Sequence, residues 1–168
     1  MELEITVSSI YWAVNFILPS YAANSIPAVF GGGKPLDCGK NFIDGERILG
    51  AHKTFKGLVS GLIAGAVVSA FEGFLIQPTL FLFGTLASVG ALGGDLVGAF
   101  IKRRLKLPPG YALPLLDQLD FVLGGLGLLS LVYTVEIGSV FQILLVTPAI
   151  HVLANMIAYV LKTKDVFW

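Results

Sequence analysis

The stretch TLFLFGTLASVGALGGDLVGAFIKRR, residues 79–104, decides the fold class. Its first part, residues 79–101, is apolar except for one carboxylate, Asp95, and it is followed by three consecutive cations. A helix of about 20 apolar residues is long enough to cross the hydrocarbon core of a bilayer. The apolar residues are continuous and do not alternate with period two, which excludes a strand of a membrane β-barrel. The stretch therefore predicts a transmembrane helix with a cationic end.

Four further apolar runs have the same character, at residues 6–30, 57–76, 119–135 and 137–161. The chain of 168 residues is 55% hydrophobic and only 13% charged, and its mean hydropathy is +0.83. Such a chain has too little polar surface to cover a water-soluble globule. We predict an all-α, polytopic membrane protein with five transmembrane helices, folded as a single domain over residues 1–168. The run at 119–135 is the weakest because it is short and rich in glycine.

The cations are distributed unevenly along the chain. All eleven Lys and Arg residues lie in the loop after the first run, in the loop after the third run or in the C-terminal tail. These three segments share one side of the membrane in a five-helix topology. Cationic loops remain in the cytoplasm, so we predict an outer N-terminus and an inner C-terminus. We expect a multi-pass protein of the cell membrane whose active site faces the cytoplasm, although basic loops often do no more than fix orientation.

Cysteine and histidine chemistry is not indicated. The single cysteine, Cys38, has no second cysteine with which to form an internal disulfide, and it falls in a loop expected to face the reducing cytoplasm. The two histidines, His52 and His151, are too few and too far apart in the sequence to suggest a zinc site.

Three carboxylates mark the predicted cytoplasmic edge of the bundle. Asp95 lies inside the third run, and Asp117 and Asp120 lie three residues apart near the start of the fourth. That spacing puts Asp117 and Asp120 on one face of a helix. Oxygen ligands of this kind suit Mg²⁺, which also accepts phosphate oxygens. We predict that the three acids are metal ligands and catalytic residues, with Lys102 acting beside them.

Lys102 follows Asp95 by seven residues, which places both on nearly the same helix face. Acids that hold magnesium and bases that hold phosphates are the two halves of a site for phosphoryl or nucleotidyl transfer. Two simpler explanations stay open. Asp95 can form a structural ion pair with a lysine, because an isolated charged acid in the membrane costs about 2.5–3.5 kcal/mol. Asp120 can cap a helix that begins at Phe121.

A second polar cluster lies in the loop GGGKPLDCGKNFIDGERILGAHKTFKG, residues 31–57. The separation of Gly45 and Gly50 is that of a P-loop, but two residues intervene before the Lys-Thr pair and no βαβ unit precedes it, so the Walker assignment fails. Glycine-rich backbone with a lysine and a hydroxyl can still surround phosphates in another geometry. Together with the cation after the third run, the predicted nucleotide contacts are Lys34, Asp37, Asn41, Asp44, Lys53, Thr54 and Arg103.

Two motifs carry a family resemblance, PLDCGKNFIDGERILGAHKTFKG at residues 35–57 and GDLVGAFIKRRLKLPPGYALPLLDQLDFV at residues 94–122. Together they resemble the archaeal CDP-archaeol synthases, and the likeness extends over nearly the whole chain. The second motif is more distantly similar to the signature of phosphatidate cytidylyltransferases. It departs from that signature at Ala99, where the signature has serine, at Gln118, where it has arginine, and at residues 111–113, where it has His-Gly-Gly.

The resemblance implies a Mg²⁺-dependent CTP:lipid-phosphate cytidylyltransferase. The expected partners are CTP, the polyprenyl glycerol phosphate 2,3-bis-O-(geranylgeranyl)glycerol 1-phosphate and the membrane, and the expected products are CDP-archaeol and pyrophosphate. We expect no nucleic-acid partner, and whether the chain forms a homo-oligomer stays open. The alternative is a small transporter in which Asp95 and Glu72 relay protons or cations. A purely structural membrane subunit is a third option, but it leaves the charged loops without a purpose.

Overall fold

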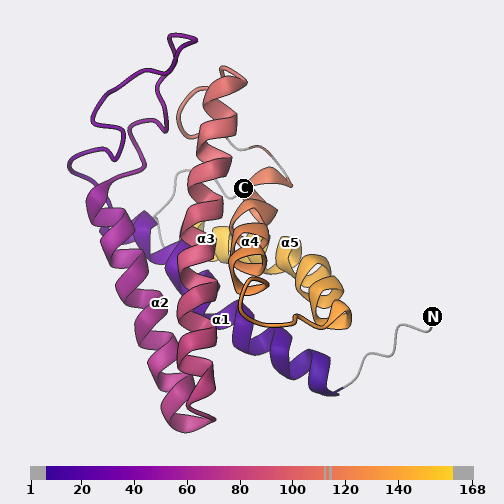
Figure 1. The fold of residues 1–168 in the computed structure, drawn as a ribbon. Helices are drawn as coiled ribbons and strands as arrows, with labels where there is room; N and C mark the ends of the chain where they lie inside the picture. The colour runs from indigo at the N-terminus through magenta and orange to yellow at the C-terminus, as the bar shows by residue number, and fades with distance from the viewer. Residues whose placement is uncertain (1–6, 112, 114, 161–168) are drawn as a thin grey trace.

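The computed structural model describes residues 7–111, 113 and 115–160, and these residues form a bundle of α-helices (Figure 1). The helices are α1 (Val7–Phe30), α2 (Phe55–Leu75), α3 (Thr79–Arg104), α4 (Leu116–Leu129) and α5 (Ile137–Val160). No strand occurs within the described ranges, so the all-α prediction is confirmed. The predicted bounds of the fourth helix are wrong, because α4 begins and ends earlier in the sequence than residues 119–135. The tail cations Lys162 and Lys164 lie outside the described residues.

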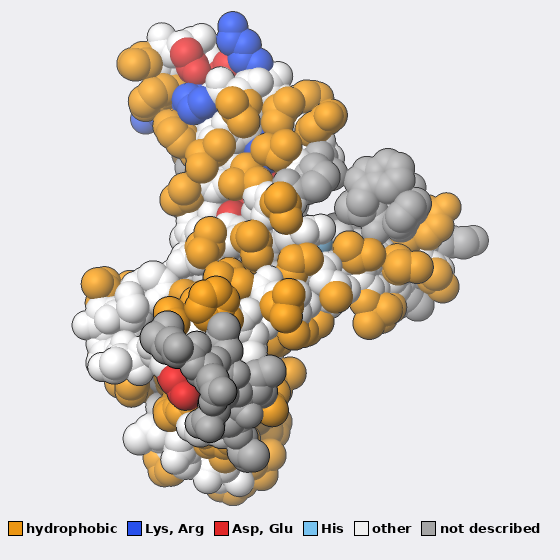
Figure 2. Space-filling model, turned by 90° about the vertical axis from the view of Figure 1, so that its right-hand side faces the viewer, with side chains coloured by type: hydrophobic (Ala, Val, Ile, Leu, Met, Phe, Trp, Pro, Cys, Tyr) orange, Lys and Arg blue, Asp and Glu red, His pale blue; other side chains and the backbone are white. Residues whose placement is uncertain are grey.

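Three helices are long and apolar enough to cross a membrane: Phe55–Leu75, Thr79–Arg104 and, within α5, Ile137–Ile157. α4 has 14 residues. At 1.5 Å per residue it rises about 21 Å, which is less than the roughly 30 Å hydrocarbon core. α1 has 24 residues and is interrupted by Pro19 and Pro27, and two asparagines lower its hydropathy. Much of the side surface is hydrophobic (Figure 2), as expected for helices that face lipid.

α3 is the central helix of the bundle. It packs against α1, α2 and α4, whereas α5 packs against α1 and α4. In Figure 1, α2 and α3 run side by side, and α1 crosses behind them. The largest fully buried apolar side chains include Phe16 of α1, Leu80 of α3 and Phe121 of α4. The core therefore joins the first, third and fourth helices.

Glycines allow two close helix crossings. On α3, Gly90, Gly94 and Gly98 face α4, and a Cβ on Gly94 would collide with the backbone carbonyl of Asp120. On α2, Gly65 faces Ser88 of α3. Glycines recur every four residues along both helices, a spacing that allows close backbone approach. The α3 glycines face α4, where Gly124 provides a second glycine surface, and this seam fixes the position of the acids on both helices.

The loop of residues 31–54 stands above the N-terminal end of α2 and lies beside the C-terminal end of α3 (Figure 1). Two isolated bridges, Pro35 with Thr54 and Asn41 with Arg47, fold it into a compact unit. The Lys and Arg side chains visible in Figure 2 gather at this end of the molecule, beyond the hydrophobic surface. The bundle therefore has one charged end, where the first loop and the end of α3 meet.

Candidate active site

Asp37 organises the first loop. Its side chain is fully buried, and it forms an ion pair with Arg47. It also accepts hydrogen bonds from the backbone N–H groups of Gly39 (3.0 Å), Leu49 (3.1 Å) and Gly50 (2.9 Å). Burial alone raises the pKa of Asp37, but these hydrogen bonds outweigh it and hold the pKa well below its usual range. Its stabilising effect is therefore present at neutral pH and is lost only as the pH falls below about 4. The carboxylate expected to contact nucleotide is engaged within the loop.

Thr54 ties the two ends of the same loop together. It is the N-cap of α2, where its hydroxyl oxygen accepts a hydrogen bond from the Gly57 N–H at 3.1 Å. The same oxygen accepts a hydrogen bond from the Gly32 N–H at 3.2 Å. Both contacts shape the loop, so the buried hydroxyl acts here as a helix cap. Lys34 and Asn41, by contrast, have exposed side chains.

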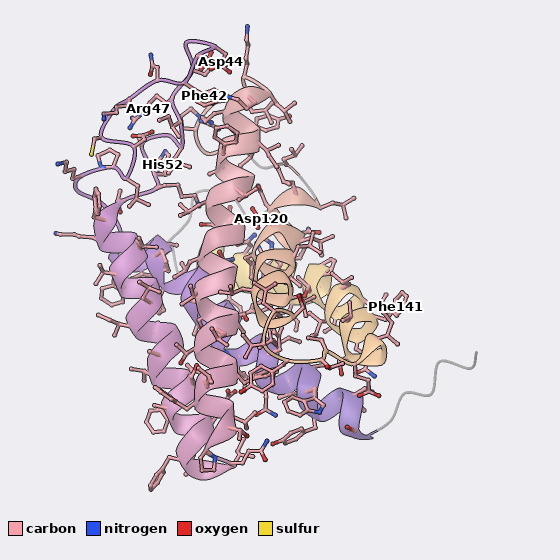
Figure 3. The ribbon with its side chains drawn as sticks, in the orientation of Figure 1. Phe42, Asp44, Arg47, His52, Asp120 and Phe141 are labelled. Carbon is pink, nitrogen blue, oxygen red and sulfur yellow. The ribbon has the colours of Figure 1, made fainter. Side chains whose placement is uncertain are left out.

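Arg104 clamps the first loop onto α3. Its Nε lies 2.8 Å from an oxygen of Asp44, and its Nη2 donates to the Arg47 carbonyl at 2.7 Å. The guanidinium also covers the rings of Phe42 and Phe100, with centroids at 4.8 and 4.7 Å. Figure 3 shows Phe42 and Asp44 beside the end of α3. Asp44 was predicted to bind nucleotide, and in the structure it pairs with Arg104. The pairing has no signal in the sequence, because the loop residues lie far from Arg104 in the chain.

Two lysines are paired with two of the three acids. Lys53 Nζ lies 2.6 Å from both oxygens of Asp95, and Lys102 Nζ lies 2.7 Å from Asp117. The other oxygen of Asp117 accepts a hydrogen bond from the Leu113 N–H at 3.0 Å. Asp95 therefore forms the lysine ion pair considered as an alternative from the sequence, and its partner comes from the first loop. Lys102, which shares α3 with Asp95, pairs with Asp117 of α4 and not with Asp95.

Asp120 lies between these two pairs. Its carboxylate packs against Gly98 of α3, one turn beyond Asp95, and Figure 3 shows it on the side of α4 that faces α3. It interacts electrostatically with Asp95, Asp117 and Lys53. The capping hypothesis is wrong, because α4 begins at Leu116 and Asp120 is inside the helix. Its Oδ1 accepts a 2.6 Å hydrogen bond from the next backbone N–H. The three predicted acids thus lie along one α3–α4 seam.

Arg103 is a buried cation between the first loop and the loop that follows α3. It is only 6% exposed, and its Nη2 donates to the Pro108 carbonyl at 3.1 Å. Its Nε has no hydrogen-bond partner within the described part of the chain. The guanidinium lies next to Gly50, where there is no side chain to cover it. A buried charged donor without a partner is costly, so Arg103 is suited to receive an anion.

Comparison with known proteins shows the family to which the chain belongs. The model of the CarS-like CDP-archaeol synthase family matches residues 4–168. The chain belongs to this family. It is 43% identical to the CDP-archaeol synthase of Methanocaldococcus jannaschii, over 91% of this chain and 94% of that protein. It is 44% identical to the CDP-archaeol synthase of Pyrococcus furiosus, over 91% of this chain and 95% of that protein.

One solved structure is also similar to this CDP-archaeol synthase family member, with a TM-score of 0.81 and 37% sequence identity. The match covers 86% of this chain and 92% of the other, which is described as an intramembrane enzyme for archaeal membrane lipids biosynthesis. With the apolar helices, this identifies the chain as a membrane-embedded enzyme. The resemblance predicted from the two motifs is confirmed, and nothing in the comparisons supports a transporter.

The seam provides suitable donor groups for the metal that the resemblance implies. Within the described residues, no three Asp, Glu, His or Cys side chains are grouped closely enough to hold a metal ion as they stand. Lysine ammonium groups instead neutralise Asp95 and Asp117, and these two carboxylates are 26% and 24% exposed. Partly exposed carboxylates are hard oxygen donors, which Mg²⁺ prefers. The donor chemistry therefore fits Mg²⁺, provided that the lysines move away.

Proposed function

We propose that this protein transfers CMP from CTP to the phosphate of 2,3-bis-O-(geranylgeranyl)glycerol 1-phosphate, giving CDP-archaeol and pyrophosphate. An oxygen of the lipid phosphate attacks the α-phosphorus of CTP, and the bond to the leaving pyrophosphate breaks. No covalent enzyme nucleophile is needed, because the lipid phosphate is already ionised at neutral pH. Family membership and the CDP-archaeol synthases among the relatives support this reaction.

The three acids on the α3–α4 seam are the proposed metal ligands. Asp95, Asp117 and Asp120 would hold Mg²⁺, which would neutralise charge on the CTP phosphates. The observation that carries the proposal is that these acids lie together with two lysines, Lys102 of α3 and Lys53 of the first loop, at the charged end of the bundle. A site that contains both anionic and cationic groups can bind a metal and a triphosphate together.

Lys53 and Lys102 would change partners when substrate binds. In the free chain each ammonium neutralises an acid, and each lysine side chain is partly exposed, by 28% and 18%. Once the acids bind the cation, the lysines are free to bind phosphate oxygens in their place. Arg103 offers its unpartnered Nε to the same anions. Lys34 and Asn41, whose side chains are exposed, would contact the nucleotide from the first loop.

The positions of its apolar and charged parts support an orientation for the bundle. We propose that all five helices are embedded in the cell membrane, with α4 reaching only part of the way across. The charged end, with the first loop and the end of α3, would face the cytoplasm. CTP would then enter from the cytosol, and the lipid phosphate would arrive sideways from the inner leaflet.

The proposed reaction can be tested with two forms of labelled CTP. Purified protein in detergent, with MgCl₂ and the lipid phosphate, should transfer label from α-labelled CTP into a CDP-lipid. With γ-labelled CTP the label should appear only in pyrophosphate, because the bond broken lies between the α- and β-phosphates. Chelation by EDTA should abolish both signals, and excess Mg²⁺ should restore them. Absence of CDP-lipid, with ion flux in liposomes instead, would refute the proposal.

A further inference from the structure

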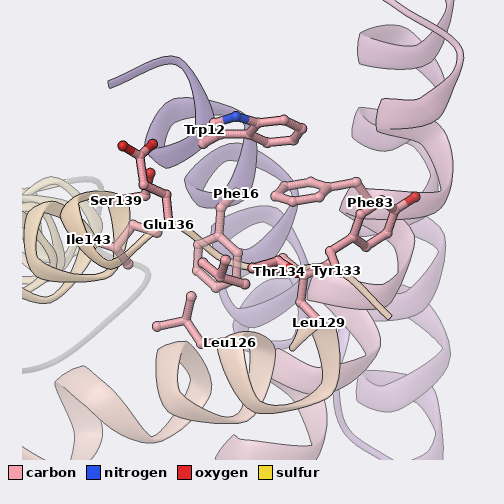
Figure 4. Close-up of a pocket in the computed structure, with 11 residues that line it drawn as sticks. Trp12, Phe16, Phe83, Leu126, Leu129, Tyr133, Thr134, Glu136, Ser139 and Ile143 are labelled. Atoms are coloured by element: carbon pink, nitrogen blue, oxygen red, sulfur yellow. The ribbon is translucent and has the colours of Figure 1, made fainter. Parts of the chain in front are cut away.

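An apolar cavity lies at the end of the bundle opposite the charged loops. Its volume is about 120 Å³. Figure 4 shows that its walls come from α1, α3, α4 and α5. The apolar lining includes Trp12, Phe16, Phe83, Leu126, Leu129 and Ile143. Two of its polar lining residues, Glu136 and Ser139, lie together on one side (Figure 4), and Tyr133 and Thr134 also line it. The proposed reaction at the charged end leaves this cavity without a role.

The distance between the cavity and the acids matches the reach of a lipid chain. Along α4, Leu126 and Leu129 follow Asp120 by six and nine residues, which is about 9–14 Å at 1.5 Å per residue. Along α3, Phe83 precedes Asp95 by twelve residues, or about 18 Å. A chain that fills one leaflet extends through half of the roughly 30 Å hydrocarbon core, or about 15 Å. A lipid whose phosphate lies at the acids would therefore end at the level of the cavity.

The size of the cavity matches the end of an isoprenoid chain. An apolar cavity of about 150 Å³ lined by Leu, Ile and Phe binds benzene, a molecule of six carbons. The cavity here is slightly smaller, so it has room for about five carbons, which is one isoprenoid unit. Its aromatic and branched side chains offer close contacts to a methyl-branched group. Phe121, next to Asp120, belongs to the same buried apolar cluster as Leu129 and Ile143 of the cavity wall, so the interior between the level of Asp120 and the cavity is apolar.

We propose that this cavity receives the terminal isoprenoid unit of one chain of the lipid substrate and thereby sets the chain length that the enzyme prefers. This inference rests on the proposed function, because it takes the lipid phosphate to lie at Asp95, Asp117 and Asp120. The cavity binds the chain end, and the acids hold the reacting phosphates. Selectivity for chain length then arises from contacts far from the reacting phosphates.

The test compares two lipid phosphates that differ by one isoprenoid unit per chain, geranylgeranyl and farnesyl. Leu126→Phe fills the cavity, and it should lower kcat/KM for the geranylgeranyl lipid by about tenfold or more, since filling a hydrophobic pocket discriminates on this scale. The farnesyl lipid, which ends short of the cavity, should be used as well as by the wild type. Leu123→Phe is the matched control, because Leu123 lies on the same helix with its side chain 54% exposed. It should leave the ratio of the two substrates unchanged.

A second variant works in the opposite direction and guards against misfolding. Trp12→Ala enlarges the cavity, and it should raise the relative kcat/KM for a lipid with chains one isoprenoid unit longer than geranylgeranyl. Unchanged substrate ratios in both variants, with the wild type active, would overturn the cavity proposal alone. An equal loss on both lipids in Leu126→Phe would also overturn it, since this would mean a structural role or occupancy by bulk lipid. A wild type inactive on every lipid would instead refute the proposed function.

Discussion

Asp117→Asn and Asp120→Asn should each lower kcat for CDP-lipid formation by about a hundred-fold or more, with the helical fold retained. The amide has the shape of the carboxylate but carries no charge, so it is a poor ligand for Mg²⁺. In Asp117→Asn, Lys102 also loses its anionic partner at 2.7 Å. The assay with α-labelled CTP measures kcat, and circular dichroism checks the helical content.

Glu46→Gln is the matched control for these two variants. It removes the same charge from the first loop, at a carboxylate that the proposed metal site does not include, and it should retain most of the activity. Full activity in both Asp117→Asn and Asp120→Asn would remove these acids from the reaction. The lysine ion pairs on the seam would then be structural, as Asp37 is in the first loop.

Gly94→Ala should separate α3 from α4 and nearly abolish activity. A Cβ at position 94 would collide with the backbone carbonyl of Asp120, and backbone has no alternative rotamer through which to yield. Overpacking of this kind typically costs about 1–3 kcal/mol of stability. It would also displace Asp120 from the other two acids. Thermal unfolding in detergent and the CTP assay measure the two effects on the same sample.

The neighbouring glycine provides the control. A Cβ at Gly93 would meet no atom within 4 Å, so Gly93→Ala should leave activity unchanged and raise helix stability slightly, because alanine is the better helix former. Equal behaviour of the two variants would mean that the contact between α3 and α4 does not position the acids.

The helices could be predicted from the sequence, because a long apolar run indicates a helix that is buried in lipid. Residues 79–101 predicted α3 to within three residues of its end, since the cations that follow continue the helix. The fourth run was harder. Its apolar residues continue to position 135, but the helix ends at Leu129 and residues 130–132 form a turn. Hydropathy does not show where the backbone leaves the helix when both sides of the boundary are apolar.

The residue types of the candidate site could also be predicted from the sequence, but the ion pairs between them could not. Helical spacing correctly placed Asp95 and Lys102 on one helix. It could not reveal that Lys53, 42 residues before Asp95, takes that acid, because such pairings arise only from the packing of distant segments. Arg103 and Arg104 are adjacent in the sequence, but helical rotation of about 100° per residue sends them to different partners. Arg103 is buried beside Gly50, whereas Arg104 holds the first loop through Asp44 and the Arg47 carbonyl.

Binding of Mn²⁺ in place of Mg²⁺ tests the central assignment most directly. Electron paramagnetic resonance can count the Mn²⁺ ions bound by the protein in detergent with an unreactive CTP analogue. The wild type should bind Mn²⁺ in the presence of the analogue, and Asp117→Asn and Asp120→Asn should each weaken that binding by at least about tenfold. Wild-type affinity for Mn²⁺ in both variants would contradict the assignment of these acids as metal ligands.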